Sequence, residues 1–236
     1  MANVSNKTKF GIIGGAGVAA TNKLLELIEM ELTQKGAYRD CHHPEMIIWQ
    51  ATKAPSRSMY LEGKGESFIP GYVEIAKKLK VCGANKLAMC CNTAHYAIDE
   101  ISKQADIEFI NLVEQCVLRT KTYTKVGLVA SDGCLKGKVY EKYFEKYCPN
   151  TEIIYPDEDY QKLVTKGICN IKNIHRFQND NENPKVIFEK VQKHLSKKGA
   201  EKIIIGCTDI RVGYFDNNNI DSLEVLKELI LNEANR

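Results

Sequence analysis

An internal repeat with one fixed offset places the strongest limit on how this chain folds. Residues 9–17 (KFGIIGGAG) resemble residues 125–133 (KVGLVASDG), an offset of 125 − 9 = 116. Residues 83–91 begin Gly-Ala-Asn-Lys and end at a cysteine, and they resemble residues 199–207 at the same offset of 116. Two separated matches that share one offset favour a duplicated domain. The 236 residues are enough for two domains of roughly 100 to 120 residues each.

Short apolar runs alternate with amphipathic stretches in both halves of the chain. The runs expected to form strands are residues 10–13, 46–49, 87–91, 126–130, 153–155 and 203–206. The stretches expected to form helices are residues 22–32, 71–79, 94–101, 139–147, 160–172, 186–195 and 223–232. This alternation predicts the α/β class, with parallel sheets covered by helices.

The charge balance and the apolar pattern argue against several classes of protein. The 33 basic and 30 acidic residues give a net charge of +3, a small excess for a nucleic-acid-binding surface. No apolar run is long enough to cross a bilayer, and the first residues do not resemble a secretion signal. The nine cysteines are odd in number and show no paired framework, as expected for free thiols. We therefore expect a cytoplasmic protein without a nucleic-acid or membrane partner.

The repeat also distinguishes two adjacent cysteines. Cys91 is equivalent to Cys207, because 207 − 91 = 116, and Cys90 is one position out of step. Neighbouring residues of a strand point to opposite faces, so Cys90 is expected to pack in the interior. Cys91 and Cys207 are therefore the pair to consider for chemistry.

Both equivalent cysteines lie where an apolar strand gives way to small polar residues. Asn92 and Thr93 follow the first cysteine, and Thr208 follows the second. In open α/β sheets, ligands bind outside the carboxyl ends of the strands. Buried cysteines followed by helix caps would be the ordinary interpretation on composition alone. Their matched positions in a duplicated domain favour a pair of functional thiols instead.

Two thiols facing each other across a cleft match the chemistry of racemisation. A thiolate on one face removes the α-proton of the substrate, and a thiol on the other face returns a proton. The unperturbed pKa of a thiol is about 8.5, so a modest shift supplies both protonation states near neutral pH. The developing negative charge needs preorganised donors, for which Asn92, Thr93, Thr208 and nearby backbone N–H groups are candidates. Nothing resembles a pyridoxal lysine site, and no cofactor is proposed.

These motifs resemble the aspartate/glutamate racemase family, especially its aspartate racemase branch, over essentially the whole chain. The matching segments are residues 11–17 with Thr21, residues 91–95 (CNTAH) and residues 206–209 (GCTD). The resemblance implies two pseudo-symmetric Rossmann-like domains with the active site in the cleft between them. It also implies catalytic Cys91 and Cys207, no cofactor, and a homodimer. The C-terminal helix of the family returns to the first domain, so we expect residues 1–113 plus 213–236 in the first domain and residues 114–212 in the second.

The resemblance extends to residues that would bind an acidic amino acid. A Pro-x-Arg segment of the aspartate racemase branch supplies an arginine for a substrate carboxylate, and Pro55-Ser56-Arg57 fits it. Guanidinium suits a carboxylate because it offers a bidentate fork; a solvated loop arginine is the alternative. A second basic residue of the family matches Lys172, and Gly15 belongs to the glycine-rich segment expected at the substrate.

The chain departs from the family at three positions. The family usually has Met and Pro where this chain has Ala16 and Val18, and Glu where it has Asp209. The last change shortens a carboxylate beside a catalytic thiol, so it bears on the choice of substrate. Aspartate is the expected substrate; glutamate, a broader set of amino acids, or binding without catalysis are the alternatives.

Three further features have a plain and a functional interpretation. Residues 41–43 (CHH) are expected in a loop, because adjacent residues rarely bind one metal ion and no other ligand spacing supports a metal site. His95 lies one helical turn after Cys91 and is expected to orient the turn rather than to tune the thiolate. Residues 60–66 form either a mobile flap over the substrate or a plain surface loop.

Overall fold

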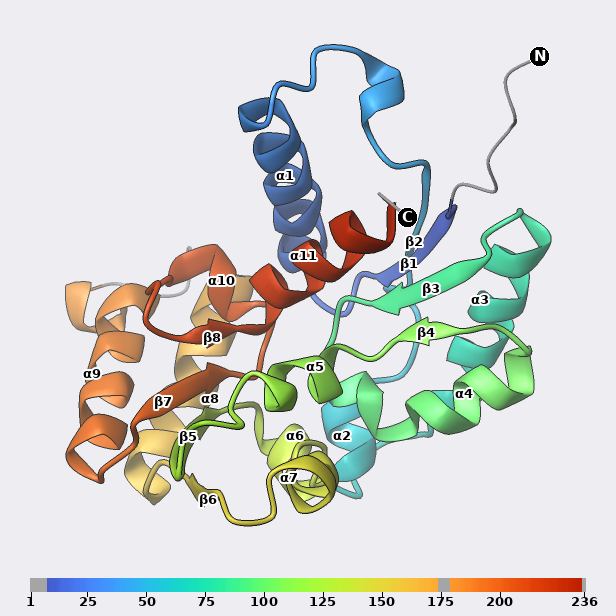
Figure 1. Cartoon of the computed structure of the whole chain (residues 1–236). Helices are drawn as coiled ribbons and strands as arrows, with labels where there is room; N and C mark the ends of the chain where they lie inside the picture. The colour runs from blue at the N-terminus through green and yellow to red at the C-terminus, as the bar shows by residue number, and fades with distance from the viewer. Residues whose placement is uncertain (1–7, 174–178, 235–236) are drawn as a thin grey trace.

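The structure, a computed structural model, describes residues 8–173 and 179–234. It contains two parallel four-stranded sheets with the strand orders β2-β1-β3-β4 and β6-β5-β7-β8 (Figure 1). The strands of the first sheet are β1 (Phe10–Gly14), β2 (Met46–Gln50), β3 (Lys86–Met89) and β4 (Phe109–Ile110). Those of the second are β5 (Lys125–Val129), β6 (Glu152–Ile154), β7 (Lys202–Ile205) and β8 (Ile220–Asp221). The predicted α/β class and its two pseudo-symmetric parallel sheets are confirmed.

The two central strand pairs have equivalent registers, and the residues of one pair are displaced from those of the other by the offset of 116. In the first sheet Phe10 of β1 lies opposite Lys86 of β3, and in the second Val126 of β5 lies opposite Lys202 of β7. Both members of the second pair are displaced by 116 residues from those of the first. The outer strands do not keep this offset, because the connections that lead to them differ in length.

Helices of different length account for that difference. The longer helices are α1 (Val18–Gln34), α3 (Ile69–Val81), α4 (Ile98–Ala105), α8 (Glu158–Lys172), α9 (Pro184–Lys197) and α11 (Ser222–Ala234). The shorter ones are α2 (Arg57–Leu61), α5 (Leu112–Leu118), α6 (Asp132–Lys136), α7 (Glu141–Tyr147) and α10 (Ile210–Gly213), with 3-10 turns η1 (Asp40–His42), η2 (Thr93–Ala97) and η3 (Asp180–Glu182). Between its first two strands, the first half has α1, whereas the second half has α6 and α7. Among the described residues, no helix is both long and apolar enough to cross a membrane.

One hydrophobic core joins the two halves. Ile12 of β1 and Leu128 of β5 are fully buried in the same cluster, together with side chains of α1, α5 and α11. The opposite faces of the sheets have separate cores, in which Ile13 packs with α3 and α4 and Val129 packs with α8 and α9. Alternate residues of one strand thus serve different cores, as the period of two requires.

The C-terminal helix packs against α1 of the first half. α11 lies next to α1 (Figure 1), and Lys227 of α11 forms an ion pair with Glu31 of α1. Lys86 Nζ of β3 lies 2.8 Å from Glu233 Oε2. However, β8 pairs with β7, so the second sheet continues beyond residue 212, the expected end of the second domain. The boundaries at residues 113 and 213 stay a prediction.

Two short strands and one strand end differ from the sequence-based expectation. β4 and β8 have two residues each, too few for a periodic signal in the sequence. β3 ends at Met89 rather than at Cys91. Cys90 still follows the strand direction, because its N–H donates to Ile13 O at 3.0 Å, and the polypeptide turns away at Cys91.

The contact between α2 and α6 depends on a glycine. A Cβ added to Gly133 of α6 would lie 2.4 Å from Ser58 Cα of α2. Because Ser58 Cα is a backbone atom, it can move away only if the whole of α2 moves. α2 belongs to the first half of the chain and α6 to the second. The glycine therefore sets how closely the two halves approach at this point.

We predict that Gly133→Ala lowers the free energy of unfolding by about 1–3 kcal/mol, because the added methyl group forces α2 and α6 apart. Chemical denaturation measures this change. Gly71→Ala is the matched control, because nothing lies within 4 Å of a Cβ at this helical position. It should leave stability unchanged or raise it by up to about 1 kcal/mol. Equal effects of the two substitutions would contradict the close contact.

Candidate active site

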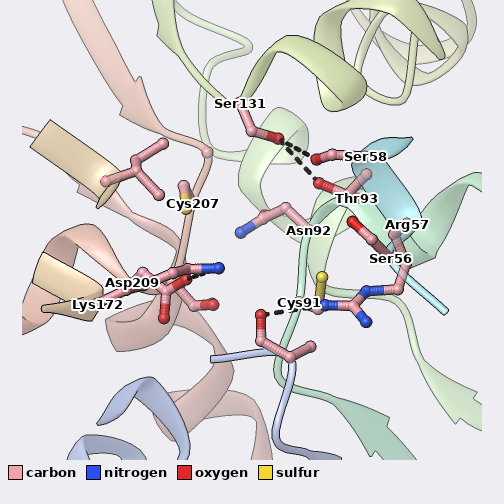
Figure 2. Close-up of a pocket in the computed structure, with 14 residues that line it drawn as sticks. Ser56, Arg57, Ser58, Cys91, Asn92, Thr93, Ser131, Lys172, Cys207 and Asp209 are labelled. Atoms are coloured by element: carbon pink, nitrogen blue, oxygen red, sulfur yellow. Dashed lines mark hydrogen bonds and ion pairs between the residues drawn. The ribbon is translucent and has the colours of Figure 1, made fainter. Parts of the chain in front are cut away.

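The two equivalent cysteines lie at the carboxyl ends of the central strands and line one cavity. Cys91 follows β3 and Cys207 follows β7, and the cavity of about 140 Å³ lies between the two sheets (Figure 2). Ligand pockets for drug-sized molecules are larger, about 300–1,000 Å³. The cavity therefore suits one small molecule. Of the eight site residues expected from the sequence, seven line it: Arg57, Cys91, Asn92, Thr93, Lys172, Cys207 and Thr208.

Gly15 is the expected residue that does not line the cavity; its neighbour Ala16 does. Gly15 has a φ of +75°, and an added Cβ would lie 2.7 Å from Ala51 N. Its own N–H donates to Thr21 Oγ1 at 3.0 Å. Gly15 is thus required by the turn after β1, which brings Ala16 to the cavity.

The thiols differ in their surroundings. Cys91 and Cys207 are partly exposed, whereas Cys90 is fully buried in the core shared by the two halves, as expected for a packing residue. Burial raises the pKa of the Cys207 thiol, and the nearby Asp209 carboxylate raises it further. Both effects favour the protonated form of Cys207. All nine cysteines are free thiols.

Arg57 begins α2 and is held at the cavity wall. Its Nη1 donates to Pro55 O at 3.1 Å and its Nη2 to Ala16 O at 3.3 Å. The guanidinium lies beside the Cys91 thiol (Figure 2). Its Nε is buried and has no hydrogen-bond partner among the described residues. The side chain is not that of a solvated loop arginine; it presents an unused donor in the site.

Lys172 and Asp209 form an ion pair on the opposite side of the cavity. Lys172 Nζ lies 3.3 Å from Asp209 Oδ2, and the lysine side chain is 51% exposed. Burial raises the pKa of the Asp209 carboxyl, and the charge of Lys172 opposes this shift. Lys172, which was aligned with the second basic residue of the racemase family, is the last residue of α8 and lines the cavity.

Asn92 and Thr208 are already engaged within the protein. The Asn92 side chain accepts from Tyr140 Oη at 2.7 Å and donates to Ser222 Oγ at 2.9 Å. Thr208 Oγ1 donates to Cys90 O at 3.3 Å. These bonds tie the ends of the two central strands to neighbouring elements. Both side chains thus help to fix the backbone next to the thiols.

Three hydroxyl groups from both halves meet at the top of the cavity in Figure 2. Ser131 Oγ lies 3.1 Å from Thr93 Oγ1 and 3.4 Å from Ser58 Oγ. Sequence reasoning missed Ser58 and Ser131. The repeat contained a signal for Ser131, because it is equivalent to Gly15 at the offset of 116. Ser58 adjoins Arg57, but only the packing of α2 on α6 brings it to the cavity.

His95 is a structural residue. It is fully buried, its Nε2 accepts from Leu112 N at 3.2 Å, and its Nδ1 lies 2.8 Å from Cys91 O. Because Nε2 is the acceptor, the proton is on Nδ1, which donates to Cys91 O. Burial lowers the pKa of His95 to about 4. The neutral imidazole fixes the backbone at Cys91, in agreement with its expected role.

Two other segments have modest roles in the described structure. The first residues of the proposed flap, residues 60–66, belong to α2, and Glu62 O accepts from Lys136 Nζ at 3.0 Å. Closure over a substrate stays a prediction. Residues 41–43 are exposed or half-buried around η1. Within residues 8–173 and 179–234, no group of three or more His, Cys, Asp or Glu side chains could hold a metal ion.

Two sheets with equivalent thiols at a shared cavity define a racemase-like α/β protein, and the comparison with known families agrees. The sequence profile of the Asp/Glu/Hydantoin racemase family matches residues 13–220. This chain belongs to that family.

Individual relatives extend the match over nearly the whole chain. The broad specificity amino-acid racemase RacX of Bacillus subtilis (strain 168) is 25% identical over 205 residues, covering 85% of each chain. The Picrophilus torridus aspartate racemase structure has a TM-score of 0.79 at 24% identity, covering 97% of this chain and 94% of that one. The glutamate racemase of Francisella tularensis subsp. tularensis SCHU S4, in complex with D-glutamate, has a TM-score of 0.58 at 14% identity, covering 96% and 82%. The two structures show the shared fold.

We predict that His95 stays neutral throughout the range from pH 5 to 8, because burial lowers its pKa to about 4. A titration of the imidazole resonances by NMR measures this directly, with His95→Gln to assign the signal. The neutral ring should carry its proton on Nδ1. A midpoint near the ordinary value of about 6.5 would contradict the burial described above.

Proposed function

We propose that this protein is a cofactor-independent racemase of an acidic amino acid, with aspartate as the first candidate. The observation that carries the proposal is the pair of thiols, Cys91 and Cys207, at equivalent ends of the two sheets and in one small cavity. Membership of the racemase family supports an amino-acid racemase. The match of fold to an aspartate racemase supports the choice of aspartate.

The proposed reaction needs one thiolate and one thiol. The thiolate accepts the α-proton and becomes a thiol, and the electron pair of the broken C–H bond is delocalised into the α-carboxylate. The opposite thiol then donates its proton to the other face of the α-carbon and becomes a thiolate. No net oxidation or reduction occurs, and the two thiols have exchanged states at the end. The same arrangement serves the reverse reaction.

The charged residues of the cavity suit an acidic amino acid. Arg57 and Lys172 provide two cations for two carboxylates, one on each side of the cavity (Figure 2). The unused Nε donor of Arg57 supports binding of a carboxylate close to Cys91. Charge that develops on the α-carboxylate during proton removal is stabilised by such preorganised donors.

A broader substrate range is the second candidate. The relative from Bacillus subtilis carries the name of a broad specificity amino-acid racemase and matches 85% of this chain. Glutamate racemisation is the alternative that keeps an acidic substrate. A chiral assay across aspartate, glutamate and neutral amino acids separates these candidates. Ligand binding without any α-proton exchange would instead indicate a non-catalytic amino-acid-binding protein.

Two further expectations accompany the proposed activity. The resemblance to the racemase family predicts a homodimer, which light scattering after size-exclusion chromatography tests. The predicted location is the cytoplasm, in agreement with the free state of the thiols. Fractionation of the native cells tests this location.

We predict that Cys91→Ala and Cys207→Ala each lower the rate of racemisation by roughly 100-fold to 10,000-fold, the usual contribution of a general acid or base. The measurement is formation of the opposite enantiomer in D₂O with deuterium at the α-carbon. Cys90→Ala is the matched control, because this adjacent thiol is buried in the core and lies outside the cavity. It should remain active. Full activity in either of the first two variants would overturn the proposed mechanism.

We predict that kcat/KM for racemisation is retained above pH values of about 8.5, the ordinary pKa of a thiol. One thiol of the pair must keep its proton, and burial together with the Asp209 carboxylate raises the pKa of the Cys207 thiol, so the inactive form with two thiolates should appear only at higher pH. Both directions should have the same kcat/KM profile, because the equilibrium constant between two enantiomers is unity at every pH. Measurement of the initial rate from each enantiomer across pH gives the profiles; a loss of kcat/KM with a midpoint at the ordinary thiol pKa would contradict the raised pKa.

A further inference from the structure

The cavity contains three charged side chains that mirror the charges of an acidic amino acid. Among its lining residues, the cations are Arg57 and Lys172, and Asp209 is the carboxylate. An acidic amino acid has two carboxylates and one ammonium group. The two cations can pair with the two carboxylates of the ligand. The ammonium group of the ligand and the Asp209 carboxylate then remain without a partner of opposite charge.

The Asp209 carboxylate has unused capacity to accept hydrogen bonds. Its side chain is buried, and its Oδ2 lies 3.3 Å from Lys172 Nζ, at the long end of an ion pair. Its Oδ1 has no hydrogen-bond partner in the described part of the chain. A carboxylate can accept about four hydrogen bonds, and an uncompensated buried charge is costly. The site thus has an anionic acceptor that a cationic donor would complete.

A glycine of the other half makes room for this carboxylate. A Cβ added to Gly17 would lie 1.7 Å from Asp209 Oδ1, closer than any two unbonded atoms can approach. Gly17 directly follows Ala16, which lines the cavity. The carboxylate of the second half therefore occupies space that the first half leaves open. It is close enough to the Cys207 thiol to raise the pKa of that group.

We propose that Asp209 binds the α-ammonium group of the substrate and so makes the site selective for amino acids over dicarboxylates that lack an amine. This inference rests on the proposed function, because it assumes that the cavity binds an acidic amino acid. An ammonium group has three N–H donors, and a carboxylate has about four acceptor sites. Asp209 can therefore accept from the substrate while it stays paired with Lys172.

The alternative is that Asp209 only positions Lys172. The two roles differ in their effect on ligands without an amine. Loss of an ammonium acceptor weakens the binding of aspartate but not that of succinate, which has the same two carboxylates and no amine. Loss of a residue that positions Lys172 changes the binding of both ligands in the same direction, because both depend on that lysine.

The experiment measures binding of aspartate and succinate, and of glutamate and glutarate, to the wild-type protein and to Asp209→Asn by calorimetry. We expect the variant to bind the amino acid of a pair roughly 10-fold to 100-fold more weakly, as for loss of a charge-assisted hydrogen bond. The matching dicarboxylate should bind equally or more tightly, because a negative charge is removed. Asp209→Glu should restore the preference for the amino acid, at least in part.

The matched control is Asp157→Asn, which removes another aspartate paired with a lysine, Lys198, outside the cavity. It should leave both affinities unchanged. Parallel changes for the two members of a pair in Asp209→Asn would overturn the proposal, as would no change in either. Failure of the wild-type protein to bind any of the four ligands would also overturn it. Because calorimetry reports binding whether or not the ligand is racemised, absence of racemisation with retained selectivity would refute only the proposed function.

Discussion

Parallel pairing of β3 with β1, repeated by β7 with β5, determines where both thiols emerge. In each sheet the central pair has the same register, so the cysteine two residues after the end of β3 or β7 reaches the same height at the sheet edge. The core shared by Ile12 and Leu128 then holds the two sheets together around α1, α5 and α11. The cavity between Cys91 and Cys207 is a consequence of these two conditions. Neither thiol can shift along its strand without breaking the pairing that supports it.

The cavity at this sheet edge is lined by polar side chains, and several of them form hydrogen bonds that fix the strand ends. His95 and Asn92 use their hydrogen bonds to hold the strand end that carries Cys91, and Thr208 bonds across to Cys90 O. The groups left with unused capacity are Arg57 Nε and Asp209 Oδ1, on opposite sides of the cavity. A substrate with both negative and positive groups would satisfy them. Residues that position the thiols are thus distinct from the residues available to a ligand.

Much of the fold was predictable because its signals are local. The apolar runs of the six longer strands and the periodicity of the main helices reflect burial on one or both faces of each element. The short strands β4 and β8 have no such signal, because two residues cannot show a period. Their pairing depends on β3 and β7 already being in place. The same holds for the end of β3, where the sequence stays apolar through Cys90 although the strand ends at Met89.

The sequence predicted the thiols and cations of the candidate site but not the other residues that line the cavity. The repeat singled out Cys91 over Cys90, and motif resemblance pointed to Arg57 and Lys172, all three of which line the cavity. Gly15 was expected there because the glycine-rich turn looked like a ligand loop, yet its backbone conformation alone explains it. Ser58 enters the site because α2 packs on α6, a contact between segments far apart in the sequence.

The sequence by itself therefore determined the duplicated α/β pattern and the identity of the paired thiols, since both follow from residue types at fixed spacings. The tertiary structure alone decided which polar groups of the cavity residues are already bonded and which have no partner among the described residues. In the sequence, Asn92 directly follows Cys91 and Asp209 lies two residues after Cys207, so both are polar residues close to one of the paired cysteines. Only packing shows that the amide of Asn92 is bonded to Tyr140 and Ser222, whereas one oxygen of Asp209 has no such partner. Hydrogen bonding between distant segments depends on three-dimensional proximity, which residue spacing does not encode.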